Sequence, residues 1–362
     1  MSTLLSYKSI NWSFICKTYV MTSKFKRSLI RKVLKYSMLA YVAITLLIIS
    51  VIVWIYFSYL SGPGAFWVNE YHPFRSESAK EEYLEYYDAK SEEWPLDSEE
   101  RMVSTSYGQT YVRISGPENA PPIVLLPGGG TSSLMWKNNI EALSENYRTY
   151  ALDDIYDWGR SVYSKKMCCS EGITQWLDEL FTALELEDSI NLVGASYGAW
   201  KAGQYLMAHP ERINKVVWLC PAYTVYQGNK EFEKRVFRGF IPLRHFMKKE
   251  LYWSCEDMAQ TEEGRAILDD HLDGLRLAIR SFKIKIPASM TVLSDDELKS
   301  IKSPVLYLAG ENEKMHSVGE AVKRLNSIAP IIETEVVPNT GHCLMFCCPD
   351  LVNDKILDFL DH

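Results

Sequence analysis

A serine flanked by glycines is the most reactive arrangement of side chains in this sequence. Ser196 lies in Gly-Ala-Ser-Tyr-Gly at 194–198, after the apolar run Ile190 to Val193 and before a stretch with helical spacing, Ala199 to Met207. A strand that turns sharply into a helix exposes such a serine as a nucleophile, and the glycines leave room for the turn to close. The pattern therefore predicts covalent chemistry at Ser196, with a chance Gly/Ser turn as the alternative.

A serine hydroxyl becomes a strong nucleophile only when a base removes its proton, and a histidine oriented by a carboxylate can do this. His342 follows the last expected strand, in Asn-Thr-Gly-His at 339–342, and the loop after strand Val305–Leu308 carries Glu313 and Glu311. We expect Ser196, Glu313 and His342 to form a catalytic triad, with Glu311 as the reserve acid. The alternatives are a surface-loop histidine and solvated glutamates.

Backbone N–H groups are needed to stabilise the negative charge that forms when a serine attacks a carbonyl group. The N–H of Tyr197, directly after the nucleophile, is one expected donor. The other should come from Gly-Gly-Gly at 128–130, after strand Ile123–Leu126, and we expect Gly129, with Gly128 next. These glycines do not precede Gly-Lys-Ser/Thr, so a phosphate-binding loop is not indicated.

Two tryptophans near these loops could line the substrate pocket or pack in the core: Trp136 and Trp158. Eight cysteines are present, but none shows the Cys-x-x-Cys pairing of a zinc site. We therefore expect no metal and no cofactor, and thiols that are free or partly buried rather than a disulfide framework.

The elements that must position these residues alternate between strands and helices. This alternation predicts a mostly parallel eight-stranded sheet with helices on both faces. The expected strands are 102–106, 110–114, 123–126, 150–152, 190–193, 216–219, 305–308 and 335–337. The expected helices are 135–143, 173–184, 199–208, 318–328 and 351–360. Residues 222–302 break the rhythm and predict an inserted helical cap.

The N-terminal part predicts a membrane anchor. Residues 1–37 are polar to basic, and residues 38–60 carry no charge over the length of a membrane-spanning helix. Basic residues before the span and acidic ones after it favour a cytoplasmic N-terminus and a domain outside the cell membrane, tethered by residues 61–100. The alternative is a cleaved signal peptide and a secreted protein.

The net charge of −7 argues against a nucleic-acid partner, because binding phosphates needs a basic face. Residues 101–221 and 303–362 are expected to form one α/β core. The anchor would make the lipid bilayer a partner through residues 38–60.

Over residues 101–362 the chain resembles the α/β-hydrolase superfamily, closest to its bacterial carboxylesterase-like and lactonase-like branch. The resemblance rests on five motifs: Leu-Pro-Gly-Gly-Gly at 126–130, Asp-Ile-Tyr-Asp-Trp-Gly-Arg-Ser at 154–161, Gly-Ala-Ser-Tyr-Gly at 194–198, Gly-Glu-Asn-Glu at 310–313 and Asn-Thr-Gly-His at 339–342. The chain departs from many relatives at Pro127, where they have His, and at Glu313, where they have Asp.

The resemblance implies a serine hydrolase, because relatives that hydrolyse epoxides or haloalkanes carry Asp where this chain has Ser196. It implies an acyl-enzyme and cleavage of an ester, thioester, lactone or amide, with a small-molecule or acyl ester as the substrate. The alternatives are a non-catalytic binding module on the same fold and an acyltransferase or perhydrolase with the same triad.

Overall fold

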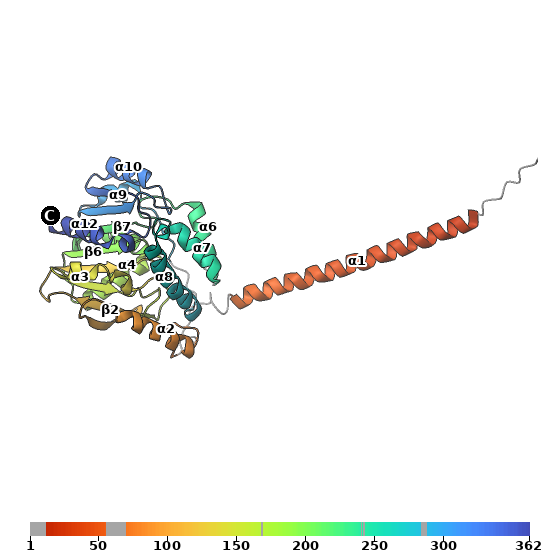
Figure 1. Ribbon diagram of the computed structural model, residues 1–362, viewed down its shortest axis with the longest axis horizontal. Helices are drawn as coiled ribbons and strands as arrows, with labels where there is room; N and C mark the ends of the chain where they lie inside the picture. Colours follow the sequence, from red (N-terminus) through yellow and green to blue (C-terminus); the bar gives the residue numbers. More distant parts are fainter. Residues whose placement is uncertain (1–11, 56–69, 168, 240, 242, 284–287) are drawn as a thin grey trace, which may run out of the picture. The chain divides into compact units, whose positions relative to one another are not determined.

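The computed structural model describes residues 12–55, 70–167, 169–239, 241, 243–283 and 288–362. The chain divides into two units, Met1–Ser61 and Gly62–His362. In the first unit, helix α1 spans Trp12–Ile55 (Figure 1). Its segment Arg31–Ile52, of 22 residues with a mean hydropathy of 1.9, is long and apolar enough to cross a membrane by length and composition. The expected span extended further, and its residues 56–60 lie outside the described residues.

The second unit is built on a sheet of nine strands. Eight follow the order β1-β2-β4-β3-β6-β7-β8-β9, and the short β5 pairs with β2. Pairing from β4 to β9 along this path is parallel, and β2 is antiparallel to each of its neighbours. The strands are β1 Glu99–Thr105, β2 Gly108–Ser115, β3 Pro122–Leu126, β4 Arg148–Leu152, β5 Val162–Tyr163, β6 Ile190–Ala195, β7 Ile213–Leu219, β8 Val305–Gly310 and β9 Ile332–Val337. The prediction of a mostly parallel sheet is confirmed.

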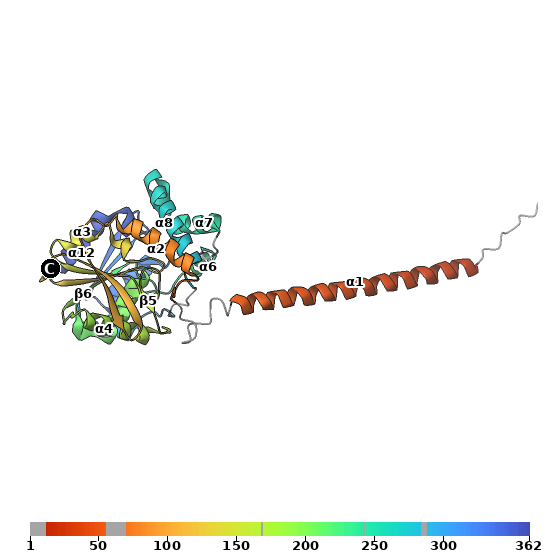
Figure 2. The same ribbon diagram turned by 90° about the horizontal axis from the view of Figure 1, so that it is seen from below.

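Helices cover both faces of this sheet, with α3 and α12 on one face and α4 on the other (Figure 2). All residues of β6 and of β8 are buried, as expected for central parallel strands covered on two sides. The helices of the core are α3 Ile140–Ser144, α4 Ser170–Ala183, α5 Tyr197–Ala208, α10 Val318–Ile328, the short α11 Leu344–Cys347 and α12 Pro349–Asp361. The buried β6 is therefore a rigid base for whatever follows it.

The expectation of one helix over 135–143 is wrong. The chain forms a short 3-10 helix, Ser133–Trp136, and then α3, which starts at Ile140. Between them the buried Asn139 donates its side-chain amide to Asn353 at 2.8 Å. This hydrogen bond ties the residue before α3 to α12.

The segment between β7 and β8 is helical in its described residues, as α6 Lys230–Gly239, α7 Arg244–Ser254, a 3-10 turn Met258–Gln260, α8 Glu262–Ser281 and α9 Asp295–Ser300. We call residues 222–302 the cap. Helix α2, Glu77–Ser91, packs against α8. Phe74, Tyr83 and Phe282 form a shared aromatic cluster there. The segment expected as a stalk is thus joined to the cap.

Candidate active site

The turn between β6 and α5 holds Ser196 in an unusual backbone conformation, with φ 52° and ψ −112°. Such a conformation is costly for a residue with a side chain and persists only where its surroundings enforce it. A Cβ on Gly194 would lie 2.5 Å from the backbone of Gly198. One on Gly198 would lie 2.2 Å from the carbonyl oxygen of Leu126. The two glycines therefore let the helix approach the sheet closely enough to expose Ser196 at its edge.

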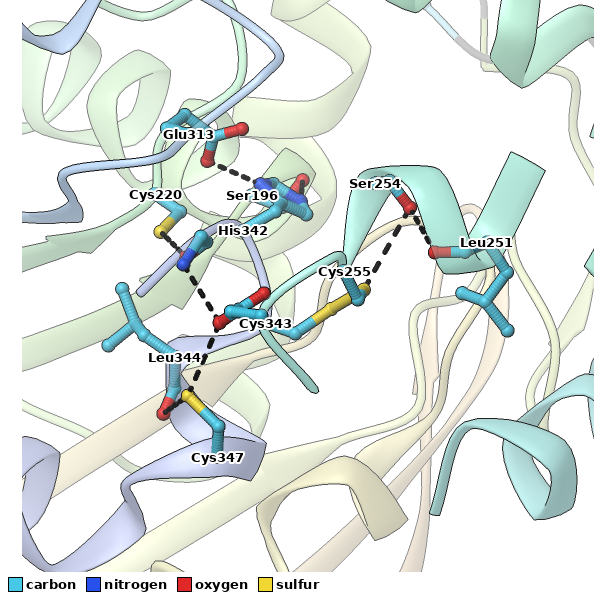
Figure 3. The surroundings of a disulfide bond; sticks show 12 residues. Ser196, Cys220, Leu251, Ser254, Cys255, Glu313, His342, Cys343, Leu344 and Cys347 are labelled. Carbon is cyan, nitrogen blue, oxygen red and sulfur yellow. Dashed lines mark hydrogen bonds and ion pairs between the residues drawn. A yellow bond between two sulfur atoms is a disulfide. The ribbon is translucent and has the colours of Figure 1, made fainter. Parts of the chain in front are cut away.

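The structure brings the three expected triad residues into hydrogen-bond contact (Figure 3). The Nε2 of His342 lies 3.1 Å from the Oγ of Ser196, and its Nδ1 lies 2.6 Å from the Oε2 of Glu313. Ser196 follows β6, Glu313 follows β8 and His342 follows β9, so parallel strands deliver all three to one edge of the sheet.

The charges of this chain of contacts support one tautomer. Burial by itself would raise the pKa of Glu313, but the charge of His342 and the N–H groups of His342 and Met315 outweigh it and lower that pKa to about 2. An ionised carboxylate can only accept, so Nδ1 of His342 carries the proton and Nε2 accepts the hydroxyl hydrogen of Ser196. Burial opposes the charged form of His342, yet the attraction of Glu313 raises the pKa of the imidazole above its usual value.

The reserve acid has a different position. Glu311 is exposed, and its Oε2 accepts the backbone N–H of Asn339 at 3.1 Å. It therefore supports the loop that leads to His342 without touching the imidazole in any contact of the described residues. The geometry favours Glu313 over Glu311 as the partner of the base.

The glycine loop after β3 lies beside the elbow. A Cβ on Gly129 would be 3.5 Å from the Cβ of Tyr197, and one on Gly128 would be 3.7 Å from the Cβ of Ser196. The N–H of Gly128 donates to the sulfur of Met135 at 3.2 Å. Among the described residues, the N–H groups of Gly129 and Tyr197 have no acceptor within the protein. They are thus available to a ligand beside Ser196.

Residues 123–355 match the sequence profile of the alpha/beta hydrolase family. The match covers more than half of the chain. It includes the glycine loop, the elbow with Ser196, and the residues Glu313 and His342. This chain belongs to the alpha/beta hydrolase family.

The hydrolase is similar to carboxylesterases over most of its own length and of theirs. It is 34% identical over 288 residues to Carboxylesterase YbfK of Bacillus subtilis, which covers 77% of this chain and 93% of that protein. The crystal structure of that carboxylesterase gives a TM-score of 0.71 with 32% identity, over 78% of this chain and 98% of the other. Naproxen esterase from Bacillus subtilis gives a TM-score of 0.72 with 30% identity, over 79% and 99%.

These relatives show that the chain is a serine hydrolase of the carboxylesterase-like branch, which hydrolyses esters. It also matches 1-acylglycerol-3-phosphate O-acyltransferase of Arabidopsis thaliana, at 27% identity over 281 residues, which covers 66% of this chain and 67% of that protein.

The two tryptophans of the hydrolase differ in position. Trp136 is fully buried in the main core, which favours core packing, one of its two expected roles, over a place in the substrate pocket. Trp158 is partly buried, packs against the cap residues of two smaller clusters and would lie 3.2 Å from a Cβ on Gly130. It joins the glycine loop to the cap, and its contact with a substrate stays a prediction.

The expectation of free thiols is wrong for one pair, because Cys255 and Cys343 form a disulfide. It joins the end of α7 in the cap to the residue after His342 (Figure 3). Buried Cys220 lies beside the triad. Its Sγ, a carboxylate oxygen of Glu313 and a ring nitrogen of His342 all lie within 4.8 Å of one another. In this cluster the N–H at Nδ1 of His342 donates to the carboxylate of Glu313, which orients the imidazole.

Sequence reasoning missed the residues that shape the glycine loop of the hydrolase. Met135 accepts from Gly128, as described above, and the carboxylate of Asp157 accepts the N–H of Gly130 at 2.7 Å. Asp153 is buried and accepts the N–H groups of Ser133 and Arg160. The sequence feature that could have indicated these contacts is the pair of aspartates directly after a strand, Asp153 and Asp154.

Proposed function

We propose that this protein is a membrane-anchored serine hydrolase that cleaves carboxylic esters, including thioesters or lactones, through an acyl-enzyme on Ser196. The observation that carries the proposal is the continuous contact from Ser196 through His342 to Glu313. Nε2 of His342 takes the hydroxyl proton while Oγ attacks the substrate carbonyl carbon. The N–H groups of Gly129 and Tyr197 stabilise the resulting oxyanion, and the start of α5 adds its dipole.

The rest of the cycle uses the same groups. The protonated imidazole gives its proton to the departing alkoxide or thiolate, which completes acylation and leaves the acyl group on Ser196. Water then enters, loses a proton to Nε2 of His342 and attacks the acyl carbon. Ser196 leaves with the proton returned by His342. Glu313 stays ionised throughout and stabilises the imidazolium that forms twice.

Acyl transfer is the second candidate, because an acyl-enzyme can react with an alcohol or peroxide in place of water. The match to a plant protein named as an acyltransferase favours it over other variants. Both candidates need the same triad, so only the products separate them. A non-catalytic binding module on the same fold would need none of these contacts.

The test of covalent catalysis is labelling by a fluorophosphonate probe, which reacts with an activated serine. We expect the full chain to be labelled and to hydrolyse short-chain esters. Ser196→Ala should lose the labelling, and its kcat/KM should fall by about 10⁴-fold or more. Ser104→Ala, an exchange on the strand β1, is the matched control. Full activity in Ser196→Ala contradicts the mechanism, and products from added alcohol in place of acid favour transfer.

The anchor is proposed from the apolar segment of α1 and from the charges around it. Arg31, Lys32 and Lys35 lie in the first turns of the segment Arg31–Ile52, before its uncharged part, and Lys24, Lys26 and Arg27 precede the segment. Short basic flanks stay in the cytoplasm, so the hydrolase unit is placed outside, where amphiphilic or external esters are within reach.

Protease added to intact cells tests this topology. We expect digestion of the hydrolase unit at the outer face. Protection until lysis indicates the reverse orientation. Release of the unit into the medium, with a new N-terminus near residue 61, indicates a cleaved signal.

A further inference from the structure

The loop that carries His342 is held on two sides. On the core side, the N–H of Asn312 donates to the carbonyl oxygen of Thr340 at 2.7 Å. On the cap side, the Oδ2 of Asp257 accepts the N–H of Gly341 at 3.0 Å. The cap thus contacts the residue directly before the imidazole.

The cap also contacts the residue directly after the imidazole, through the disulfide between Cys255 and Cys343. This bond joins positions 88 residues apart in the sequence. Figure 3 shows the disulfide beside His342, at the end of the helix that carries Leu251 and Ser254. Two positions of one short cap segment, Cys255 and Asp257, therefore bracket His342.

Asp257 also acts on the imidazole by charge. The titratable groups that face His342 are Glu313 and His316 from the loop after β8, Cys220 from the end of β7 and Asp257 from the cap. Burial disfavours the imidazolium, and Glu313 followed by Asp257 favour it, so that the pKa of His342 is raised. Phe232 of α6 lies near the ring, with centroids 6.2 Å apart, and adds no charge.

We propose that Asp257 is a positioning residue for the base His342, and that the disulfide between Cys255 and Cys343 shares this task. The cap then does more than cover the site, because it fixes the distance from Nε2 of His342 to Ser196. The inference rests on the proposed triad. A loop held at two points tolerates the loss of one better than the loss of both.

Two substitutions separate the hydrogen bond of Asp257 from its charge. Asp257→Ala removes both, and we expect kcat to fall about tenfold with KM changed less than about twofold, because misplaced catalytic groups slow the chemical step. Asp257→Asn keeps an oxygen that can accept the N–H of Gly341, so kcat should recover most of this loss.

The acid limb of the pH profile of kcat/KM reports the charge. Neutral His342 is the active form, so activity is lost as the pH falls through its raised pKa. Without the negative charge of Asp257 that pKa falls, and both variants should keep activity to lower pH, by on the order of half a pH unit. A residue with a purely structural role would not shift this limb.

The matched controls are Asp273→Ala and Asp273→Asn. Asp273 is an exposed carboxylate of the cap that pairs with Arg244 at 3.0 Å. Thermal unfolding of the full chain in detergent checks that each variant is folded. If the Asp257 variants match the Asp273 variants in kcat and in the acid limb, while Ser196→Ala is inactive, the positioning role is overturned and the triad stands. If Ser196→Ala is active, the triad itself fails.

The disulfide is tested by reduction with a phosphine. We expect a fall in kcat of about twofold to fivefold in the wild type, reversed on reoxidation, and a larger fall in Asp257→Ala. The double variant Cys255→Ser, Cys343→Ser should show the lower kcat and no response to the reductant. Unchanged kcat in the reduced wild type overturns the contribution of the disulfide.

Discussion

The elbow around Ser196 and the loop around His342 meet at one hydrogen bond, yet they are held in different ways. The elbow is enclosed by main-chain atoms. A Cβ added to Gly194 would lie 2.5 Å from backbone atoms, and one added to Gly198 would lie 2.2 Å from them. The loop of His342 has a backbone contact too, from the N–H of Asn312 to Thr340, but it also depends on the side chains of Glu313 and of Asp257 from the cap. Backbone contacts move little, whereas side chains and an inserted cap can shift.

This difference assigns separate tasks to the two regions. The elbow provides a nucleophile whose position is set by backbone atoms of the buried strand β6, of helix α5 and of the neighbouring strands β3 and β7. The loop of His342 depends on the loop after β8 and on the cap. Changes at the elbow should therefore damage folding, and changes at the base loop should damage rate.

Among the changes at the loops that hold His342, the largest effect is expected at the acid. Glu313→Gln should lower kcat by about 100-fold or more, because it removes the negative charge that stabilises the imidazolium and leaves the tautomer of His342 undefined. Glu311→Gln is the matched control and should stay within about threefold, since Glu311 contacts a backbone N–H. Steady-state kinetics on one ester compares them, and the reverse order would show that Glu311 is the acid.

A methyl group at the elbow is expected to act on stability. Gly198→Ala places a Cβ 2.2 Å from the carbonyl oxygen of Leu126, and the backbone cannot yield cheaply. We expect a loss of roughly 1–3 kcal/mol in the free energy of unfolding, measured with denaturant. Gly319→Ala in α10 is the control, because nothing lies within 4 Å of its added Cβ. Equal stability of the two variants would contradict the rigid elbow.

A methyl group at the base loop is expected to have the smallest effect. Gly341→Ala places a Cβ 3.1 Å from the Oδ1 of Asp257, a side chain that can turn away. The free energy of unfolding should change by less than about 1 kcal/mol, while kcat falls about twofold to fivefold as the loop shifts. Steady-state or single-turnover kinetics measure the rate, and thermal unfolding measures the stability. A large loss of stability would show that this loop is as rigid as the elbow.

Most of the sheet could be predicted from local pattern, because central parallel strands are apolar along their whole length. β3, β6, β7 and β8 were found this way. β5 was missed since it has two residues, and the break before α3 was missed because Asn139 bonds a residue 214 positions away. The residues next to Trp136 in the sequence also do not show that its side chain is fully buried.

By itself the sequence determined the elbow, the glycine loop and the candidate base, because glycine spacing and strand-to-helix order are local and their geometry follows from backbone sterics. Only the tertiary structure showed that Glu313, and not Glu311, contacts His342, since both follow the same strand and differ in which loop atoms they reach. It also showed the disulfide and the contact of Asp257 with Gly341. Those contacts join the cap to the loop of His342, and pairing across that distance depends on how the chain folds back.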